Sequence, residues 1–389
     1  MTPFVHDEIS AATAMSEYQY YEFQAIDRPL GDADRRSLRA LSTRARITAT
    51  SFTNSYEWGD FKGDPADLMK RWFDMHIYVA NWGTRRLMIR LPARLIDRQR
   101  IDGFLGTVDW VELTISGENL ILDILCEEVE PEDDWDDGSG WLAALAPLRA
   151  DVLSGDLRLF YLLWLMAVDA ETLGPEEVAP LHGIGPMTGA LEAFARFLDL
   201  DADLVAAAAE CPAETAADAS MASDAAQQFA AALPDSEKTT MLARLIEGDP
   251  YVASELRQRA RSSTPAAGPA APTVAELQAR ASAIRDIRKR KEDERLAAER
   301  KRQEAAEARA RRTRLDAIIR RGDGIWREIE TEIECRNAPG YDKAARLLMD
   351  LKTIAEENGS TADFTRRLHS IIERHARKER FIARLNELV

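Results

Sequence analysis

The chain has 389 residues, of which 46% are hydrophobic, so it can bury at least two cores and is too long for one ordinary domain. Its net charge is −16, and Cys126, Cys211 and Cys335 are too widely spaced for a disulfide framework or a Cys-x-x-Cys metal site. The longest apolar run, Leu157 to Val168, falls short of the ~20 residues of a membrane span, and the N-terminus lacks a signal-peptide pattern. We therefore expect a soluble cytoplasmic protein without membrane contact.

The first part of the chain has the pattern of a small sheet domain. Residues 1–14 are expected to be a disordered leader, and Met15 is a candidate start. An aromatic strand at Tyr18–Ile26 is followed by a capped helix at Asp32–Leu41 and a strand at Ile47–Phe52.

A second set of elements extends this domain. Asp64-Pro65 marks a helix start, and Leu68, Trp72, Met75 and Val79 recur at helical spacing until Gly83. A strand at Arg85–Leu91, a helix at Ala93–Phe104 and a hairpin turning at Gly117–Asn119 follow. We predict an α+β fold, with a small mixed-sheet domain over residues 15–138.

Helix signals dominate residues 139–261, for which we predict an all-helical middle domain. The expected helices are Leu142–Leu153 with a kink at Pro147, Leu157–Ala170, Met187–Leu198, Asp203–Glu210, Ala225–Leu233, Ser236–Ile246 and one from Tyr251. Residues 262–273, SSTPAAGPAAPT, have the composition of a semi-extended linker.

The remainder of the chain predicts a long basic helix and a helical bundle. Val274–Arg321 contains no Gly or Pro and can form one helix of ~70 Å. Its apolar residues are too sparse for a sustained coiled-coil seam, so we expect a solvated helix. Residues 322–389 predict three amphipathic helices, Ile325–Arg336, Tyr341–Glu357 and Thr361–Val389.

The charge is divided unevenly along the chain. Residues 1–261 hold 23 Lys/Arg against 45 Asp/Glu, a net charge of −22, whereas residues 262–389 hold 28 against 22, a net charge of +6. An acidic body repels phosphate backbones, and a basic arm attracts them. The two parts are therefore expected to face different partners.

The acidic loop Glu127–Asp137 has the carboxylate density that a hard cation requires. Its spacing fits no EF-hand, so we favour a solvated loop, with a metal site as the alternative. Aromatic residues beside the acids would suit the docking of a basic surface. The metal candidates are Asp133, Asp134, Asp136 and Asp137, and the flanking interface candidates are Trp135 and Trp141.

Two turns rich in Trp, Gly and charge stand out in the sheet domain, at residues 58–65 and 81–86. Each can be explained as a helix terminus. Trp and Arg are also common anchors of protein interfaces, which makes Trp58, Trp82, Arg85 and Arg86 interface candidates.

Two features could contact nucleic acid. The segment 280–321 contains 16 Lys/Arg and 8 Asp/Glu. Its candidates for an acidic or nucleic-acid partner are Arg288, Lys289, Arg290, Lys291, Arg300, Lys301, Arg302, Arg311, Arg312 and Arg314. The segment Leu181–Pro186 resembles the Gly-x-Gly hairpin of helix-hairpin-helix modules, but its flanks are acidic, and we favour a plain helix connection.

The first half of the chain contains three distinctive segments, SEYQYYEFQAIDRPL, WGDFKGDP and NWGTRRLMIRLP. From Met15 to about Glu210 the chain resembles a family of uncharacterised bacterial proteins. The resemblance implies a bacterial cytoplasmic protein and brings with it no activity, cofactor or catalytic residue.

Three functions remain open at this point. We favour a non-enzymatic adaptor or scaffold subunit of a bacterial complex, with protein partners for the body and the arm and with oligomerisation through the arm as an option. The alternatives are binding of DNA or RNA through residues 280–321 and metal-dependent hydrolysis by the loop 127–137. No cofactor is predicted, because no phosphate-binding, dinucleotide-binding or nucleophile motif is present. A basic arm could also fold onto the acidic loop.

Overall fold

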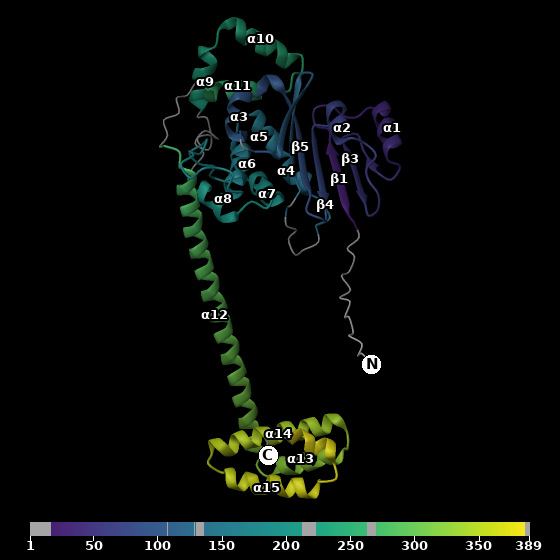
Figure 1. Ribbon diagram of the computed structural model, residues 1–389, viewed down its shortest axis with the longest axis vertical. Helices are drawn as coiled ribbons and strands as arrows, with labels where there is room; N and C mark the ends of the chain where they lie inside the picture. The colour runs from purple at the N-terminus through teal and green to yellow at the C-terminus, as the bar shows by residue number, and fades with distance from the viewer. Residues whose placement is uncertain are drawn as a thin grey trace, which may run out of the picture. The chain divides into compact units, whose positions relative to one another are not determined.

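A computed structural model describes residues 17–106, 108–127, 129, 136–211, 223–262 and 270–385 (Figure 1). The chain forms two compact units, which divide between Ile287 and Arg288. We call them the body and the C-terminal unit. The body contains a sheet followed by helices, and the C-terminal unit is helical, which confirms the α+β class. No helix in the described ranges is both long and apolar enough to cross a membrane.

The body is built around one seven-stranded sheet with the order β2-β3-β1-β4-β5-β7-β6. Every neighbouring pair is antiparallel, so the expected mixed sheet is wrong in this detail. The predicted hairpin is confirmed, with Gly117 at a φ of 60° in its turn. The strands are β1 Gln19–Gln24, β2 Arg46–Ile47, β3 Ser51–Tyr56, β4 Met75–Ala80, β5 Arg85–Pro92, β6 Val111–Ser116 and β7 Asn119–Cys126.

The helix predicted from Asp64 to Gly83 is only half right. Asp64 caps α2, Pro65–Arg71, by accepting a hydrogen bond from the Ala66 amide at 2.8 Å. The chain then becomes β4, the strand between β1 and β5. Met75 and Val79 are buried on the same sheet face, so their spacing of four fits a strand as well as a helix.

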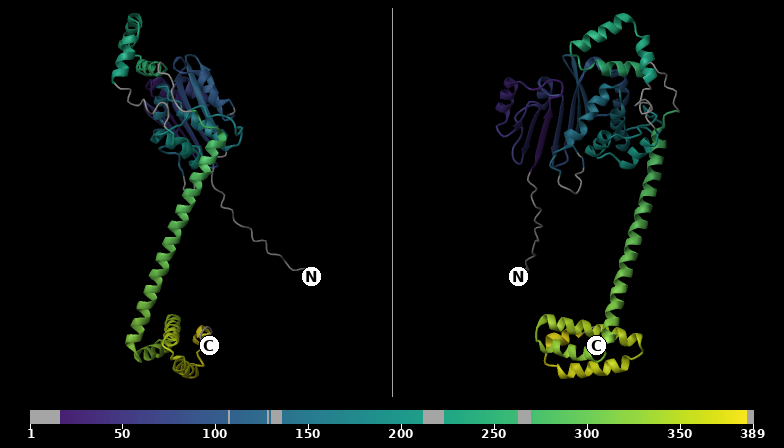
Figure 2. Two further views of the ribbon diagram at one scale, coloured as in Figure 1. Left: turned by 90° about the vertical axis from the view of Figure 1, so that its left-hand side faces the viewer. Right: turned by 180° about the vertical axis from the view of Figure 1, so that it is seen from behind.

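Helices cover the two sheet faces at different places (Figures 1 and 2). On one face, α1 (Asp32–Leu41) and α2 enclose a core with Phe23, Phe52 and Phe73. On the other face a larger core joins Ile77, Leu87 and Leu122 to a helical layer. This layer contains α3 Arg98–Leu105, α4 Trp141–Leu145, α5 Pro147–Leu153, α6 Arg158–Asp169, α7 Gly189–Phe197 and α8 Ala202–Ala209. The predicted break at Pro147 separates α4 from α5.

The chain that follows the Pro/Ala segment is attached to the body. Helix α12, Val274–Arg321, begins with Val274, Leu277 and Ala281 buried in the larger core. The amides of Ala179 and Val274 donate to the carbonyls of Pro272 and Glu177 at 2.8 and 2.9 Å. The boundary between the units therefore falls within α12 and not in residues 262–273.

Further helices complete the two units. The body also contains α9 Ser223–Ala232, α10 Asp235–Ile246 and α11 Val252–Ser262. The C-terminal unit packs Ile329, Leu348, Phe364 and Phe381 into its own core. Its elements are α13 Gly324–Glu334, α14 Ala338–Glu357, α15 Thr361–Arg374, α16 Glu379–Ile382 and a 3-10 turn at Ala383–Leu385. The predicted last helix therefore ends early, at Arg374.

A buried ion network joins the sheet to the helical layer. Asp74 is fully buried and accepts hydrogen bonds from the amides of Ile26 and Asp27 and from the guanidinium of Arg90. Arg149 of α5 is also buried and donates to Asp27 at 2.6 Å and to the Arg90 carbonyl at 2.9 Å. Burial alone would raise the pKa of Asp74, but its hydrogen bonds and Arg90 outweigh burial and lower it.

Removing Arg149 should destabilise the body strongly. In Arg149→Met, the fully buried Asp74 loses one of its two cations and Asp27 loses its ion pair, so we expect the free energy of unfolding to fall by roughly 3 kcal/mol. Urea denaturation followed by circular dichroism measures the change. The matched control is Arg94→Met, because Arg94 and Arg149 both lie over the Tyr251 ring, but Arg94 forms a half-exposed pair with Asp249. It should cost less than ~1 kcal/mol. Equal losses in the two variants would contradict the buried network.

His76 should make the body sensitive to acid. It is fully buried on β4, its Nδ1–H donates to the Glu22 carbonyl at 2.9 Å, and its ring stacks on Phe23. Burial lowers its pKa from 6.5 to about 3. Between these values the unfolded chain binds a proton that the folded chain does not, so stability falls as the pH is lowered, by up to ~1.4 kcal/mol per pH unit.

Denaturation of His76→Phe between pH 7 and pH 4 tests this. The variant should lose most of the difference in stability that wild type shows across that range. His369→Phe, which changes an exposed residue of the C-terminal unit, should keep it. An unchanged pH dependence in His76→Phe would exclude His76 as the acid-sensitive group.

Candidate functional site

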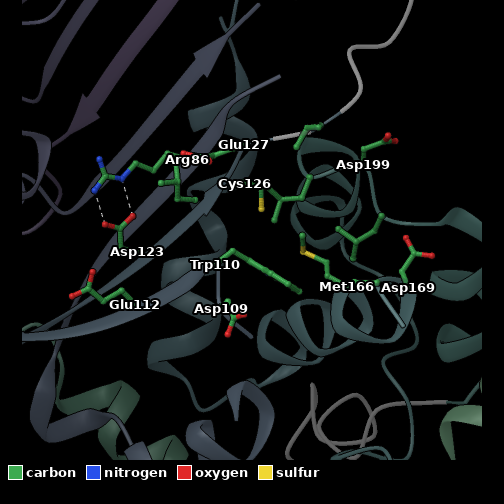
Figure 3. Close-up of a pocket in the computed structure, with 15 residues that line it drawn as sticks. Arg86, Asp109, Trp110, Glu112, Asp123, Cys126, Glu127, Met166, Asp169 and Asp199 are labelled. Atoms are coloured by element: carbon green, nitrogen blue, oxygen red, sulfur yellow. Dashed lines mark hydrogen bonds and ion pairs between the residues drawn. The ribbon is translucent and has the colours of Figure 1, made fainter. Parts of the chain in front are cut away.

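A cavity of about 840 Å³ opens on the body where β7 ends and β6 begins (Figure 3). Cys126 and Glu127 come from the end of β7, and Asp109 and Trp110 from the turn before β6. The ends of α6 and α7 supply the opposite wall, which includes Met166, Asp169, Leu198 and Asp199. We call this cavity the acidic pocket.

Carboxylates dominate the polar lining of the acidic pocket. Among the described residues that line it, Arg86 is the one cation, and its guanidinium donates to both oxygens of Asp123, at 2.8 and 2.6 Å. The remaining five carboxylates give the lining a net charge of −5. Burial raises the pKa of Asp169, and the nearby carboxylate of Asp201 raises it further. The six acids are Asp109, Glu112, Asp123, Glu127, Asp169 and Asp199.

The rest of the lining is apolar. Trp110, Leu125, Met166 and Leu198 form part of it, and the Trp110 indole nitrogen is buried without a hydrogen-bond partner in the described part of the chain. Burial raises the pKa of the Cys126 thiol to about 12, so at neutral pH it is protonated and a poor nucleophile. An apolar lining beside carboxylates suits a long side chain with a cationic end, such as Lys or Arg.

Three of the sequence candidates meet in an internal cluster. Arg85 and the Trp141 indole both donate to Asp136 Oδ2, at 2.6 and 2.8 Å. Phe197 packs against both donors. Burial alone would raise the pKa of Asp136, but these hydrogen bonds and that of Gly138 lower it. Asp136, Arg85 and Trp141 therefore fasten the end of the loop to the sheet and to α7.

The other candidates of the body are scattered. Trp58 and Trp82 are exposed, at 76% and 48%, and stay interface candidates, whereas Arg86 is paired with Asp123. The Asp137 side chain accepts from the Ser139 amide. Asp133, Asp134 and Trp135 lie outside the described residues. Within the described ranges, no three His, Cys, Asp or Glu side chains are grouped as metal ligands.

The basic candidates lie on a stretch of α12, residues 285–314, in which every residue is exposed. Arg311, Arg312 and Arg314 contact α14, through Thr353, Glu357 and Asp350. They belong to the internal contacts of the C-terminal unit. The candidates that face solvent along this helix are the earlier ones, between Arg288 and Arg302.

Backbone amides of the Gly183–Gly185 hairpin are hydrogen-bonded to other residues of the body. The amides of Ile184 and Gly185 donate to the carbonyls of Ala208 and Cys211 at 3.1 and 3.0 Å. A Cβ atom on Gly183 would lie 2.2 Å from the Cys211 carbonyl oxygen. The hairpin is therefore packed against the end of α8, and these amides cannot hold a DNA phosphate.

Gly183→Ala should test this packing. The clash with a backbone carbonyl should lower the free energy of unfolding by roughly 1–3 kcal/mol. Gly189→Ala is the control, because a Cβ atom there meets no atom within 4 Å and Ala favours α7. Thermal unfolding measures both. A Gly183→Ala variant as stable as wild type would contradict the close packing against α8.

Comparison with protein-family models, with curated proteins and with solved structures finds no match for the chain. The resemblance to a bacterial family stays a prediction. The acidic pocket was missed in the sequence because its residues come from strand and helix ends far apart along the chain. Their shared signal is an acid at an element terminus or within two residues of it, as at Asp109, Asp169 and Asp199.

Proposed function

We propose that the protein is a non-enzymatic adaptor whose body binds a basic side chain of a partner protein in the acidic pocket. The observation that carries this proposal is the lining of that pocket. Five carboxylates have no counter-ion among the described residues of the lining, and they surround apolar side chains in one cavity. A Lys or Arg side chain would place its aliphatic part on Trp110 and Met166 and its charge near Asp169 and Asp199.

The charge of the body supports a basic partner. Residues 1–287 hold 25 Lys/Arg against 47 Asp/Glu, a net charge of −22. Such a surface attracts cationic proteins at long range and repels nucleic acid. The thiol in the pocket is protonated at neutral pH, which fits recognition better than nucleophilic chemistry.

A second surface of opposite sign completes the adaptor. Residues 288–389 hold 26 Lys/Arg against 20 Asp/Glu, a net charge of +6, and the α12 side chains from 288 to 302 are exposed. One chain thus presents an acidic and a basic unit. We infer that the two units serve different partners.

A tetra-arginine peptide is a direct probe of the acidic pocket. It should bind the full-length protein at low salt and shift the indole N–H resonance of Trp110, assigned with Trp110→Phe. Asp169→Asn with Asp199→Asn should weaken binding at least tenfold, because each lost charge contact contributes ~1 kcal/mol or more. Isothermal titration calorimetry measures the affinity.

The control carries the same change of charge elsewhere on the body. Glu118→Gln with Glu247→Gln alters two exposed acids outside the pocket and should leave the affinity within about twofold of wild type. Equal weakening in both double variants, or binding that leaves the Trp110 resonance in place, would show general electrostatic attraction and would overturn the proposal.

A further inference from the structure

The C-terminal unit contains a second cavity, of about 1090 Å³. Arg336, which follows α13, and Ala338 and Tyr341 in the first turns of α14 form one side. The end of α15 and the turn into α16, residues 373–380, form the other side, together with Arg384. We call this cavity the basic pocket.

The lining of the basic pocket is strongly cationic. It contains six Arg and Lys side chains against Glu373 and Glu379, a net charge of +4. Concentrating like charges around one cavity costs stability unless an anion occupies it. The six cations are Arg336, Arg374, Arg377, Lys378, Arg380 and Arg384.

The cations fall into two groups. Arg374 and Arg384 are held by Glu330 and Asp342 outside the lining. Arg336, Arg377 and Arg380 are exposed and form no ion pair with any residue in the described part of the chain. Lys378 donates to the Ile333 carbonyl at 2.9 Å, which leaves its charge uncompensated. Four cationic groups therefore face the pocket without a carboxylate partner.

We propose that the basic pocket binds a compact polyphosphate, a small molecule with two or more adjacent phosphate groups. Guanidinium groups present paired N–H donors that match phosphate oxygens, and the preference for Arg over Lys in the lining fits this geometry. Set against Glu373 and Glu379, the four unpaired cations leave a net charge of +2, and their N–H donors far outnumber the oxygen atoms of one phosphate group. The cavity is slightly larger than the usual range of small-molecule pockets, ~300–1,000 Å³, so it has room for such a ligand.

The pocket is less suited to a nucleic-acid strand. Single-stranded nucleic acid is usually held by exposed aromatic rings on which its bases stack. Tyr341, the one Phe, Tyr or Trp residue among those that line the pocket in the described chain, is only 8% exposed and lies beneath the Arg384 guanidinium. A small ligand that presents several phosphates to one cavity is therefore favoured over an extended chain.

Titration of the full-length protein with inorganic tripolyphosphate tests the proposal. It should bind by isothermal titration calorimetry, and Arg377→Gln with Arg380→Gln should weaken binding at least tenfold. Arg320→Gln with Arg346→Gln is the matched control, because it removes two exposed arginines of the same unit outside the pocket and should change the affinity less than twofold. Circular dichroism verifies that both variants fold.

The imidazole of His375 gives a local signal. Burial lowers its pKa, and Lys378 lowers it further. Bound polyphosphate should raise this pKa, as followed by NMR and assigned with His375→Gln. Binding without a change at His375 would overturn the proposal, as would the absence of binding at low salt or equal weakening in both double variants.

The source of the phosphates is tested separately. If an oligothymidylate competes with tripolyphosphate at equal phosphate concentration, the pocket binds nucleic acid. That result would overturn the proposal of a compact ligand. Citrate binding as tightly as tripolyphosphate would overturn the preference for phosphate. The outcome of this test does not depend on the proposed adaptor function. That function is assigned to an acidic site in the body and is tested with a cationic peptide.

Discussion

Asp74 is the residue on which the arrangement of the body depends. It is a charged group with no exposure to solvent, so its position must be one where enough donors converge. Those donors come from the end of β1 and from Arg90 of β5, on either side of the strand that Asp74 precedes. Arg90 also donates to the Met69 carbonyl of α2, and Arg149 of α5 donates to the Arg90 carbonyl. One carboxylate thus fixes three strands and a helix on each face.

The same network explains where sequence reasoning failed. Residues 65–83 have helical spacing, and local signals cannot show that Asp74 is fixed by partners far along the chain. The strand that follows is buried on both faces, so His76 and Ile77 alternate between two cores and not between core and solvent. A strand of this kind lacks the alternation of apolar and polar residues by which strands are recognised in a sequence.

Short sequence motifs predicted correctly those features that depend only on residues close together in the chain. The hairpin at Gly117, the cap at Asp64 and the break at Pro147 need only neighbouring residues, and the structure has all three. The candidate sites were harder to predict from the sequence. Arg85 and Trp141 had the right residue types for an interface and Asp136 for a metal ligand, but these three side chains are hydrogen-bonded to one another inside the body. Both pockets assemble from element ends, and only the packing of distant helices and strands creates them.

The attachment of α12 affects how the protein can be divided. A boundary drawn by composition would cut the chain after Thr273, yet the next three turns supply Val274, Leu277 and Ala281 to the core of the body. A shortened protein ending there would leave an apolar groove open to water and lose the partners of Asp201 and Glu210, which are Arg285 and Arg280. The smallest complete body must therefore keep the chain through Ile287, so the unit that folds is longer than the one that composition outlines.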